Sequence, residues 1–515
     1  MKSSQLKPNP VHKPGLRPKS LKAKKLKTAQ TVINKNTEIN QAWLDANPGP
    51  YAVQGGSKTN IIEITFLENL NVKQNTYFMI KTDYVNINGN ANTLFFENIK
   101  DYVGLVQNTK FSNIIVSNIR NSGKNSSLLE TSGWFLGSNY GINSIENKVL
   151  VCTNYLPISP YSGGIVGENS KIHAIDCINN GEFVVDVYKS SRSGGICAYN
   201  CTGTIENCLN NSNMPERCGG MIYVTNNSIT IKNSSNKGNI GHLSAGMITF
   251  AVSNQENNNE LIIENCDNIG EIIGGYNQYG NSSGANGICF SSEVKTTINN
   301  CINYGNIRIF YSNTGIIGYI ENSTTISNCK NYGEIRGDAG IVYLVNSNDV
   351  EIKDCINYGN IDLLTASGII RFTLGNNIKI NNCINRGKLK AEFTSGILFR
   401  SYEEKVSVKN CKNYGNIDGQ NSGGISTKFS PITVEDCTNH GVINGVGCGG
   451  IFASGTPKGS IAVNCVNNAT VNGENAGGIF GAWSQGTAKS CKNGGKLVGL
   501  NAQPILGHKS TGKIE

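Results

Sequence analysis

One short motif, Cys-x-Asn-x-Gly, returns through most of this 515-residue chain at a nearly constant interval. From Cys301 onward, successive motif cysteines are 28, 26, 28, 28, 26, 28 and 26 residues apart, and asparagine stands two positions after each. A fixed period near 27 residues indicates a solenoid, in which each unit packs only on its neighbours. The motif cysteines are Cys177, Cys208, Cys266, Cys301, Cys329, Cys355, Cys383, Cys411, Cys437, Cys465 and Cys491, and Ser234 takes that position once.

Each unit contains three short segments that we interpret as β-strands. A Gly-Ile or Gly-Met pair opens the unit, an alternating segment such as Glu-Ile-Lys-Asp precedes the cysteine, and Gly-x-Ile or Gly-x-Leu follows the asparagine. Alternation of apolar and polar residues is typical of strands with one buried face. Three strands in each 27 residues predict an all-β fold, a single parallel β-helix, which the usual chirality of parallel crossovers makes right-handed.

The flanks of the repeat array differ from it in composition. The proline-containing, basic N-terminal stretch is typical of a disordered arm. A short capping helix and turn follow, with Thr37 as the expected N-cap and Asn47-Pro48-Gly49 as the stop. We therefore divide the chain into a disordered arm, a capping helix and turn, irregular coils, regular repeats and a C-terminal tail, at residues 1–36, 37–50, 51–161, 162–499 and 500–515.

Two columns of equivalent residues are expected along the solenoid. The asparagines two residues after each cysteine suit a left-handed corner, because asparagine tolerates that conformation, and stacked amides form hydrogen-bonded ladders. The cysteines are expected to be small, buried, reduced thiols, since parallel side chains about 4.8 Å apart have the wrong geometry for disulfides. Reduced thiols and the lack of a signal-peptide pattern favour an intracellular reducing compartment or a virion.

The position after the column asparagine carries Tyr304, Tyr332, Tyr358, Arg386 and Tyr414 in consecutive units. Exposed tyrosines in a row offer apolar bodies with polar tips, which suits a sugar or a protein partner. Stacking of rings along a corner, with no ligand, is the alternative interpretation. We name these five residues the tyrosine column.

Nine lysine and arginine residues lie within the first 28 positions, which contain no Asp or Glu, and the net charge of the whole chain is +9. The rest of the chain is therefore neutral. This arm is predicted to contact a nucleic acid or an acidic protein, although a merely solubilising tail remains the alternative. The densest cluster is Lys19, Lys22, Lys24, Lys25 and Lys27.

Residues for catalysis or metal binding are not grouped in the sequence. Glycoside hydrolysis needs two carboxyls at a set separation, whereas Glu351, Asp354, Glu435 and Asp436 do not recur in matching positions of adjacent units. There is no CxxC pair and the chain has five histidines. We expect no catalytic residues, no cofactor, no metal, no small-molecule substrate and, without an 18-residue apolar run, no membrane span.

The motif Gly-Gly-Ile-x-Gly, followed by an alternating strand, Asn-Cys and Asn-x-Gly-x-Ile, resembles the GLUG-type repeat over about two thirds of the chain. That resemblance implies a right-handed β-helix of surface or adhesive proteins. The asparagine-rich, cysteine-containing units also resemble uncharacterised repeat proteins of giant amoebal DNA viruses. The leading hypothesis is a non-enzymatic structural or interaction rod, as a virion or virus-factory component tethered by its basic arm. A carbohydrate-active β-helix and a surface adhesin are the alternatives.

The C-terminal end supplies one further expectation. The chain after Leu500 contains no convincing capping helix, and an uncovered last coil presents strand edges that a second chain extends. We therefore predict self-association through the C-terminal coil.

Overall fold

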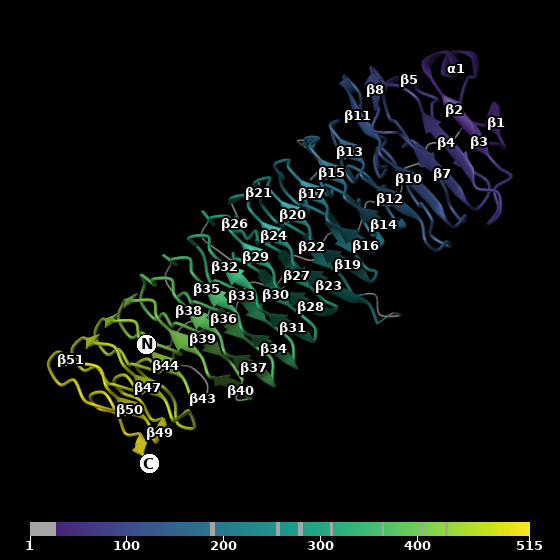
Figure 1. Ribbon diagram of the computed structural model, residues 1–515. Helices are drawn as coiled ribbons and strands as arrows, with labels where there is room; N and C mark the ends of the chain where they lie inside the picture. Colours follow the sequence, from purple (N-terminus) through teal and green to yellow (C-terminus); the bar gives the residue numbers. More distant parts are fainter. Residues whose placement is uncertain are drawn as a thin grey trace.

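The computed structural model is a long rod of stacked coils, with the N-terminal strands at one end and the C-terminal strands at the other (Figure 1). Within the described residues, the regular elements are one short helix and many β-strands, which pair almost entirely in parallel. The prediction of an all-β parallel solenoid is therefore confirmed. The structure describes residues 27–185, 191–253, 258–276, 282–308, 313–362, 365–403, 405–427 and 431–515.

The longest strands form one continuous sheet, here called the long-strand sheet. Equivalent residues of successive coils face each other in it, for example Ile326, Ile352 and Ile380. In pairing order its strands are β2 (Thr37–Ile39), β4 (Ile62–Phe66), β7 (Val85–Asn88), β10 (Ile114–Ser117), β12 (Lys148–Leu150), β14 (Lys171–Ile175), β16 (Thr202–Glu206), β19 (Ile229–Lys232), β23 (Glu260–Glu264), β28 (Lys295–Asn299), β31 (Thr324–Ser327), β34 (Val350–Lys353), β37 (Ile378–Asn381), β40 (Val406–Lys409), β43 (Thr433–Glu435), β46 (Ile461–Val463), β49 (Thr487–Lys489) and β52 (Lys513–Ile514).

The strands that follow the motif cysteines form a second, 16-stranded sheet, here called the asparagine sheet. Most of its strands are two residues long, with the first side chain outward and the asparagine buried. Its strands are β5 (Leu70–Val72), β8 (Thr93–Glu97), β11 (Arg120–Lys124), β13 (Thr153–Asn154), β15 (Ile178–Asn179), β17 (Leu209–Asn210), β20 (Ser235–Asn236), β24 (Asp267–Asn268), β29 (Ile302–Asn303), β32 (Lys330–Asn331), β35 (Ile356–Asn357), β38 (Ile384–Asn385), β41 (Lys412–Asn413), β44 (Thr438–Asn439), β47 (Val466–Asn467) and β50 (Lys492–Asn493).

A third side of the rod is built in two parts, joined by single β-bridges. The N-terminal part contains β1 (Thr31–Ile33), β3 (Tyr51–Val53), β6 (Phe78–Ile80) and β9 (Val106–Gln107). The later part, here called the aromatic sheet, contains β18 (Ile222–Thr225), β22 (Ile248–Ala251), β27 (Cys289–Ser292), β30 (Ile317–Ile320), β33 (Val342–Val345), β36 (Ile370–Thr373) and β39 (Leu398–Ser401).

Short segments complete the coils after the Gly-x-Ile positions. They pair through single bridges such as Ile335 with Ile361, and through two small sheets. The strands of these sheets are β21 (Ile240–Gly241), β25 (Ile272–Tyr276), β26 (Ser282–Ser283), β42 (Ile417–Asp418), β45 (Ile443–Asn444), β48 (Val471–Asn472) and β51 (Leu497–Val498).

Alternation along the long strands builds the core. In β34, Val350 and Ile352 are buried while Glu351 and Lys353 face outward. Because a strand alternates its side chains between two faces, every coil adds the same apolar residues to one continuous interior.

The N-terminal elements differ from expectation. The first strand, β1, lies inside the stretch predicted as a disordered arm, and Ile33 is buried there. The helix α1 spans Gln41–Ala46, and Asn40 caps it by accepting a hydrogen bond from the Trp43 amide. Thr37 is therefore not the N-cap: it begins β2, because pairing with β4 in the long-strand sheet takes precedence over helix formation.

The C-terminal residues also differ from expectation, because 500–515 continue the solenoid as a further coil. Gln503 bridges to Gly477, Leu506 bridges to Phe480, and β52 pairs with β49. The interpretation of this segment as a tail was wrong. The sequence contains little indication of this last coil, because residues 500–515 lack the Cys-x-Asn motif.

The residue with left-handed backbone conformation was predicted to be the asparagine two positions after each cysteine, and this prediction was wrong. Positive φ angles occur at the residue before the cysteine, such as Asn328 (56°), Asp354 (56°) and Asn382 (55°). The asparagine after the cysteine is instead the second residue of a strand. Asn and Asp suit the position before the cysteine because they tolerate the left-handed region.

Candidate functional site

An unbroken ladder of asparagine amides runs inside the asparagine sheet. Each Nδ2 donates to the Oδ1 of the next asparagine at 2.8 or 2.9 Å, as Asn331 does to Asn357 and Asn357 to Asn385. The same Nδ2 donates to a carbonyl two residues ahead, which closes the corner. The predicted asparagine ladder is therefore confirmed. Its members are Asn121, Asn154, Asn179, Asn210, Asn236, Asn268, Asn303, Asn331, Asn357, Asn385, Asn413, Asn439, Asn467 and Asn493.

The close approach of successive coils explains the glycine that ends most of the motifs. A Cβ on Gly359 would collide with the carbonyl of Gly333 and would lie 2.8 Å from the Asn331 amide nitrogen. Glycine, which has no Cβ, suits this close approach of one coil to the next, although Ser212 and Ala469 take the position in two units.

The tyrosine column lies one residue beyond this ladder and faces outward. The Tyr332 amide donates to the Asn303 carbonyl, and the Tyr358 amide donates to the Asn331 carbonyl, so the backbone holds each column residue over its predecessor. The four tyrosines are between 37% (Tyr358) and 47% (Tyr304) exposed. The structure thus brings the five predicted residues into one surface column.

The rings of this column are stacked face to face. Tyr304 and Tyr332 have centroids 5.3 Å apart and planes at 9°, and Tyr332 and Tyr358 are 4.6 Å apart at 3°. Partial burial and the two neighbouring phenols raise the pKa of Tyr332 above its usual value, because both disfavour the phenolate.

Arg386 continues the stack in place of an aromatic residue. Its guanidinium carbon lies 5.9 Å from the Tyr358 centroid and 4.9 Å from the Tyr414 centroid. His440 then stacks on Tyr414 at 4.7 Å and 5°. A flat cation between two rings fits because guanidinium groups stack on aromatic faces.

The stacking decides which part of each ring faces a ligand. Tyr332 is covered on one face by Tyr304 and on the other by Tyr358, while Tyr358 lies between Tyr332 and Arg386. A sugar or a nucleic-acid base that stacks on an aromatic residue needs a free ring face. The inner members of the column therefore offer ring edges and hydroxyls instead.

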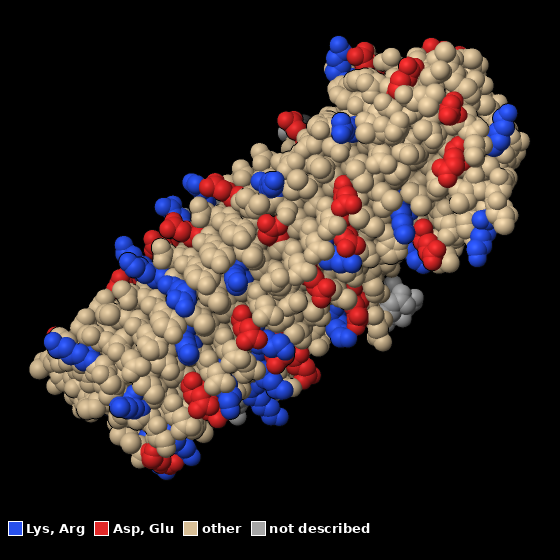
Figure 2. Space-filling model, in the orientation of Figure 1, with Lys and Arg blue, Asp and Glu red and all other residues tan. Residues whose placement is uncertain are grey.

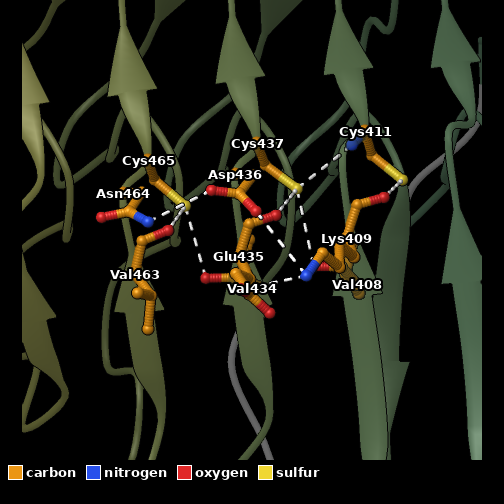
Figure 3. A network of polar contacts seen from close by, with 10 residues as sticks. All are labelled: Val408, Lys409, Cys411, Val434, Glu435, Asp436, Cys437, Val463, Asn464 and Cys465. Carbon is orange, nitrogen blue, oxygen red and sulfur yellow. Dashed lines mark hydrogen bonds and ion pairs between the residues drawn. The ribbon is translucent and has the colours of Figure 1, made fainter.

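The motif cysteines form a second inward column, parallel to the asparagines. Cys437 donates to the carbonyls of Glu435 (3.2 Å) and Val408 (3.6 Å), and Cys465 repeats the pattern in the next coil (Figure 3). All 17 cysteines of the chain are free thiols, and only Cys491 is partly exposed. Burial raises the pKa of the Cys355 thiol well above its usual value, so this thiol stays protonated.

Three of the four carboxylates considered for catalysis form surface ion pairs with lysines, and the fourth, Asp354, accepts a hydrogen bond from the Asn382 side-chain amide. Glu351 lies 2.9 Å from the Lys353 ammonium nitrogen. Lys409 lies 3.1 Å from Glu435 and 3.8 Å from Asp436, as Figure 3 shows. Figure 2 shows acidic and basic residues interspersed over the visible face of the rod, with neither sign gathered in one large field.

The part of the chain that the structure describes contains neither a cluster of metal ligands nor a membrane-crossing helix. Within those residues no group of three or more His, Cys, Asp or Glu side chains is placed to hold a metal ion. No helix among them has both the length and the apolar character needed to cross a membrane.

The basic cluster lies almost wholly outside the described residues, which begin at Lys27 and exclude Lys19, Lys22, Lys24 and Lys25. The backbone amide of Lys27 donates to the Tyr77 hydroxyl at 3.0 Å, so the described chain is held against the rod from its first residue. Binding of nucleic acid or an acidic protein by the arm stays a prediction.

The last coil exposes residues that are buried in earlier coils. Ile514 is 63% exposed although its strand partner Ala488 is buried, and Leu497 is half-buried where Ile417 and Ile443 are buried. Self-association through this coil stays a prediction.

A buried row of aromatic rings on the aromatic sheet was missed by the sequence analysis. Its rings alternate between two adjacent strand positions and meet mostly edge to face, as Tyr343 meets Phe372 at 5.7 Å and 83°. The signal was an aromatic residue two or three positions after the Gly-Ile or Gly-Met pair of seven consecutive units. The row comprises Tyr223, Phe250, Phe290, Tyr319, Tyr343, Phe372 and Phe399, with 2–7% exposure.

No family model, curated protein or solved structure matches this chain. The resemblance to the GLUG-type repeat and to giant-virus proteins therefore rests on the sequence motif alone and stays a prediction.

Proposed function

We propose that this chain is a non-enzymatic structural and interaction rod that holds partner-binding residues at a fixed spacing along one edge. The observation that carries the proposal is the exposed tyrosine column, mounted one residue away from the buried asparagine ladder. A solenoid with equivalent coils presents such residues as an extended, repetitive surface.

The contacts between coils support the rigidity that this role needs. Each coil joins the next through strand pairing and a buried amide hydrogen bond. Buried, satisfied polar networks fix one register, because any slip leaves amide groups unpaired in the interior. The tyrosines therefore keep their spacing without depending on a partner.

Two observations favour this function over a carbohydrate-active β-helix. The inner rings of the tyrosine column have no free face for a sugar. The carboxylates Glu351, Glu435 and Asp436 are engaged by lysines and lie on the outer side of the long-strand sheet or beside it. Neither arrangement resembles a pair of opposed carboxyls across a bound glycan.

The basic arm and the cellular setting extend the proposal. A tether through residues 1–28 predicts that removal of residues 1–26, which leaves β1 intact, weakens binding to duplex DNA or RNA and flattens its salt dependence. If the full chain and the chain without residues 1–26 bind the nucleic acid equally and weakly, the arm is not a tether. A place in a virion or virus factory predicts that the chain copurifies with particles, which mass spectrometry of purified particles tests.

The central experiment compares what the rod captures from an extract of its source. The Tyr332→Ser/Tyr358→Ser variant is expected to lose the captured partner while its melting temperature falls only slightly. Tyr155→Ser is the matched control, because Tyr155 holds the same position in an earlier coil and is 54% exposed. Equal capture by the double variant and the wild type would contradict a role for the column.

A further inference from the structure

The surface around the tyrosine column is wider than one residue. In each coil, the residue two positions earlier also faces outward, and three of these are half-buried isoleucines: Ile302, Ile356 and Ile384. Strand pairing places these residues in one row along the rod. The order in the row is Ile302, Lys330, Ile356, Ile384 and Lys412. Ring edges and isoleucine side chains thus form one apolar strip along the rod, of the kind that marks a protein-binding surface.

The strip also carries more cations than anions when the next outward residue of each coil, at the fifth position after the cysteine, is included with it. In the four coils from Cys329 to Cys411, twelve outward residues occupy the first, third and fifth positions after the cysteine. Four of the twelve are cations, namely Lys330, Arg386, Lys388 and Lys412, and one, Glu334, is an anion. The strip therefore has a local excess of three positive charges, whereas residues 29–515 as a whole are neutral.

We propose that an extended acidic segment of a partner protein, with apolar residues among its carboxylates, lies along this strip. Carboxylates accept hydrogen bonds from Arg386, the lysines and the tyrosine hydroxyls, and charge-assisted bonds of this kind are the stronger ones. Apolar side chains of the segment pack on the isoleucines and ring edges. This inference deepens the proposed function and rests on it.

Other occupants fit the surface less well. A second copy of the chain, placed with its own strip against this one, would bring two cationic surfaces together, which like-charge repulsion opposes. A nucleic acid or a glycan supplies flat faces or rings for stacking, yet both faces of Tyr332 and Tyr358 are already covered. A carboxylate-bearing peptide needs only edges, hydroxyls and cations.

Fluorescence anisotropy with the full chain tests the inference directly. The probe is a fluorescein-labelled peptide of glutamate and leucine, and poly-glutamate and dextran sulfate are the competitors without apolar side chains. The wild type is expected to bind the peptide at least about tenfold more tightly than either polyanion. Arg386→Glu/Lys388→Glu is expected to weaken peptide binding about tenfold or more, since two attractive contacts become repulsive.

The matched control reverses two charges on another side of the rod. Lys379, in β37, and Lys405, just before β40, are exposed in neighbouring coils of the long-strand sheet. Lys379→Glu/Lys405→Glu is expected to bind the peptide within about twofold of the wild type. An equal loss in this control, equal binding of dextran sulfate, or no peptide binding by the wild type would overturn the acidic-segment inference.

Two outcomes separate this inference from the proposed function. If the Arg386→Glu/Lys388→Glu variant still captures the partner that Tyr332→Ser/Tyr358→Ser loses, the rod function stands and the acidic segment is wrong. If both variants capture the partner like the wild type, the interaction role of the column is wrong as well.

Discussion

Two columns of residues, adjacent in the chain, run along the same corner of the rod and behave differently. Asn357 is fully buried and exchanges hydrogen bonds with Asn331 and Asn385, whereas its neighbour Tyr358 is 37% exposed and stacks on Tyr332. Both contacts recur in consecutive coils. Repetition alone therefore does not say what a contact contributes.

Burial decides the difference between the two columns. A buried amide without a partner loses the hydrogen bonds it would make with water, while an exposed ring that loses its neighbour remains solvated. We infer that the asparagine column specifies the fold and that the tyrosine column is free to serve binding. Substitutions on each side of this boundary test that division.

The largest effect is expected for Asn357→Leu. Leucine has a similar size but leaves the Asn331 amide, the Asn385 carbonyl oxygen and the Gly359 carbonyl without their partner. We expect the variant to lose about 4 kcal/mol of unfolding free energy or more, since each buried unpaired group costs roughly 1–3 kcal/mol. Urea denaturation measures this loss. A loss under about 1 kcal/mol would contradict a stabilising role for the asparagine ladder.

A slightly smaller effect is expected for Phe372→Ala in the buried aromatic row. Phe372 is 7% exposed and packs at 5.7 Å against both Tyr343 and Phe399. Truncation of a buried phenylalanine costs about 3 kcal/mol or more. If thermal and urea denaturation show a cost no greater than that of Tyr358→Ser, burial is not what separates the two kinds of column.

Alkaline pH is expected to weaken the buried interior of the rod. Burial raises the pKa of Cys218 from 9.0 to about 12. Between these values the folded chain keeps the proton that the unfolded chain releases, so stability present below pH 9 is lost as pH rises toward 12.

The Cys218→Ala variant isolates this contribution. Above pH 9 the unfolding free energy of the wild type is expected to fall more steeply than that of the variant. The difference between the two slopes is about 1.4 kcal/mol per pH unit. Urea denaturation from pH 8 to 11 measures both slopes, and identical slopes would contradict a protonated, buried thiol.

The smallest effect is expected for Tyr358→Ser. Its ring contacts only Tyr332 and Arg386 in the stack and faces solvent. The expected cost is about 0.5 kcal/mol, because aromatic pairs contribute roughly 0.5–1.5 kcal/mol and exposure lowers that value. A cost like that of Asn357→Leu in the same denaturation assay would make the tyrosine column structural.

The repeat predicted much of the corner, because residues at one position of a constant period must lie in one file. The asparagine lies two residues after the cysteine and the tyrosine lies three residues after it. These constant offsets were enough to place the asparagine ladder and the tyrosine column. Period alone does not say which residue turns the chain, so the left-handed residue was placed after the cysteine instead of at Asn328 or Asp354.

Other errors arose where the motif is missing. Strand β1 lies in a stretch whose lysines and prolines resemble a disordered arm, yet pairing with β3 orders it. The buried aromatic row alternates between two strand positions, so it has no single offset from the glycine and the repeat did not reveal it.

An experimental structure of the chain, by crystallography or electron cryomicroscopy, at a resolution that places side-chain amides, tests whether the asparagines of successive coils form one ladder. We expect Asn331, Asn357 and Asn385 in one file, each amide nitrogen within about 3 Å of the next amide oxygen, with Tyr332 and Tyr358 stacked outside them. Density that puts these three asparagines on different sides of the rod would contradict the ladder, the tyrosine column and the function proposed from them.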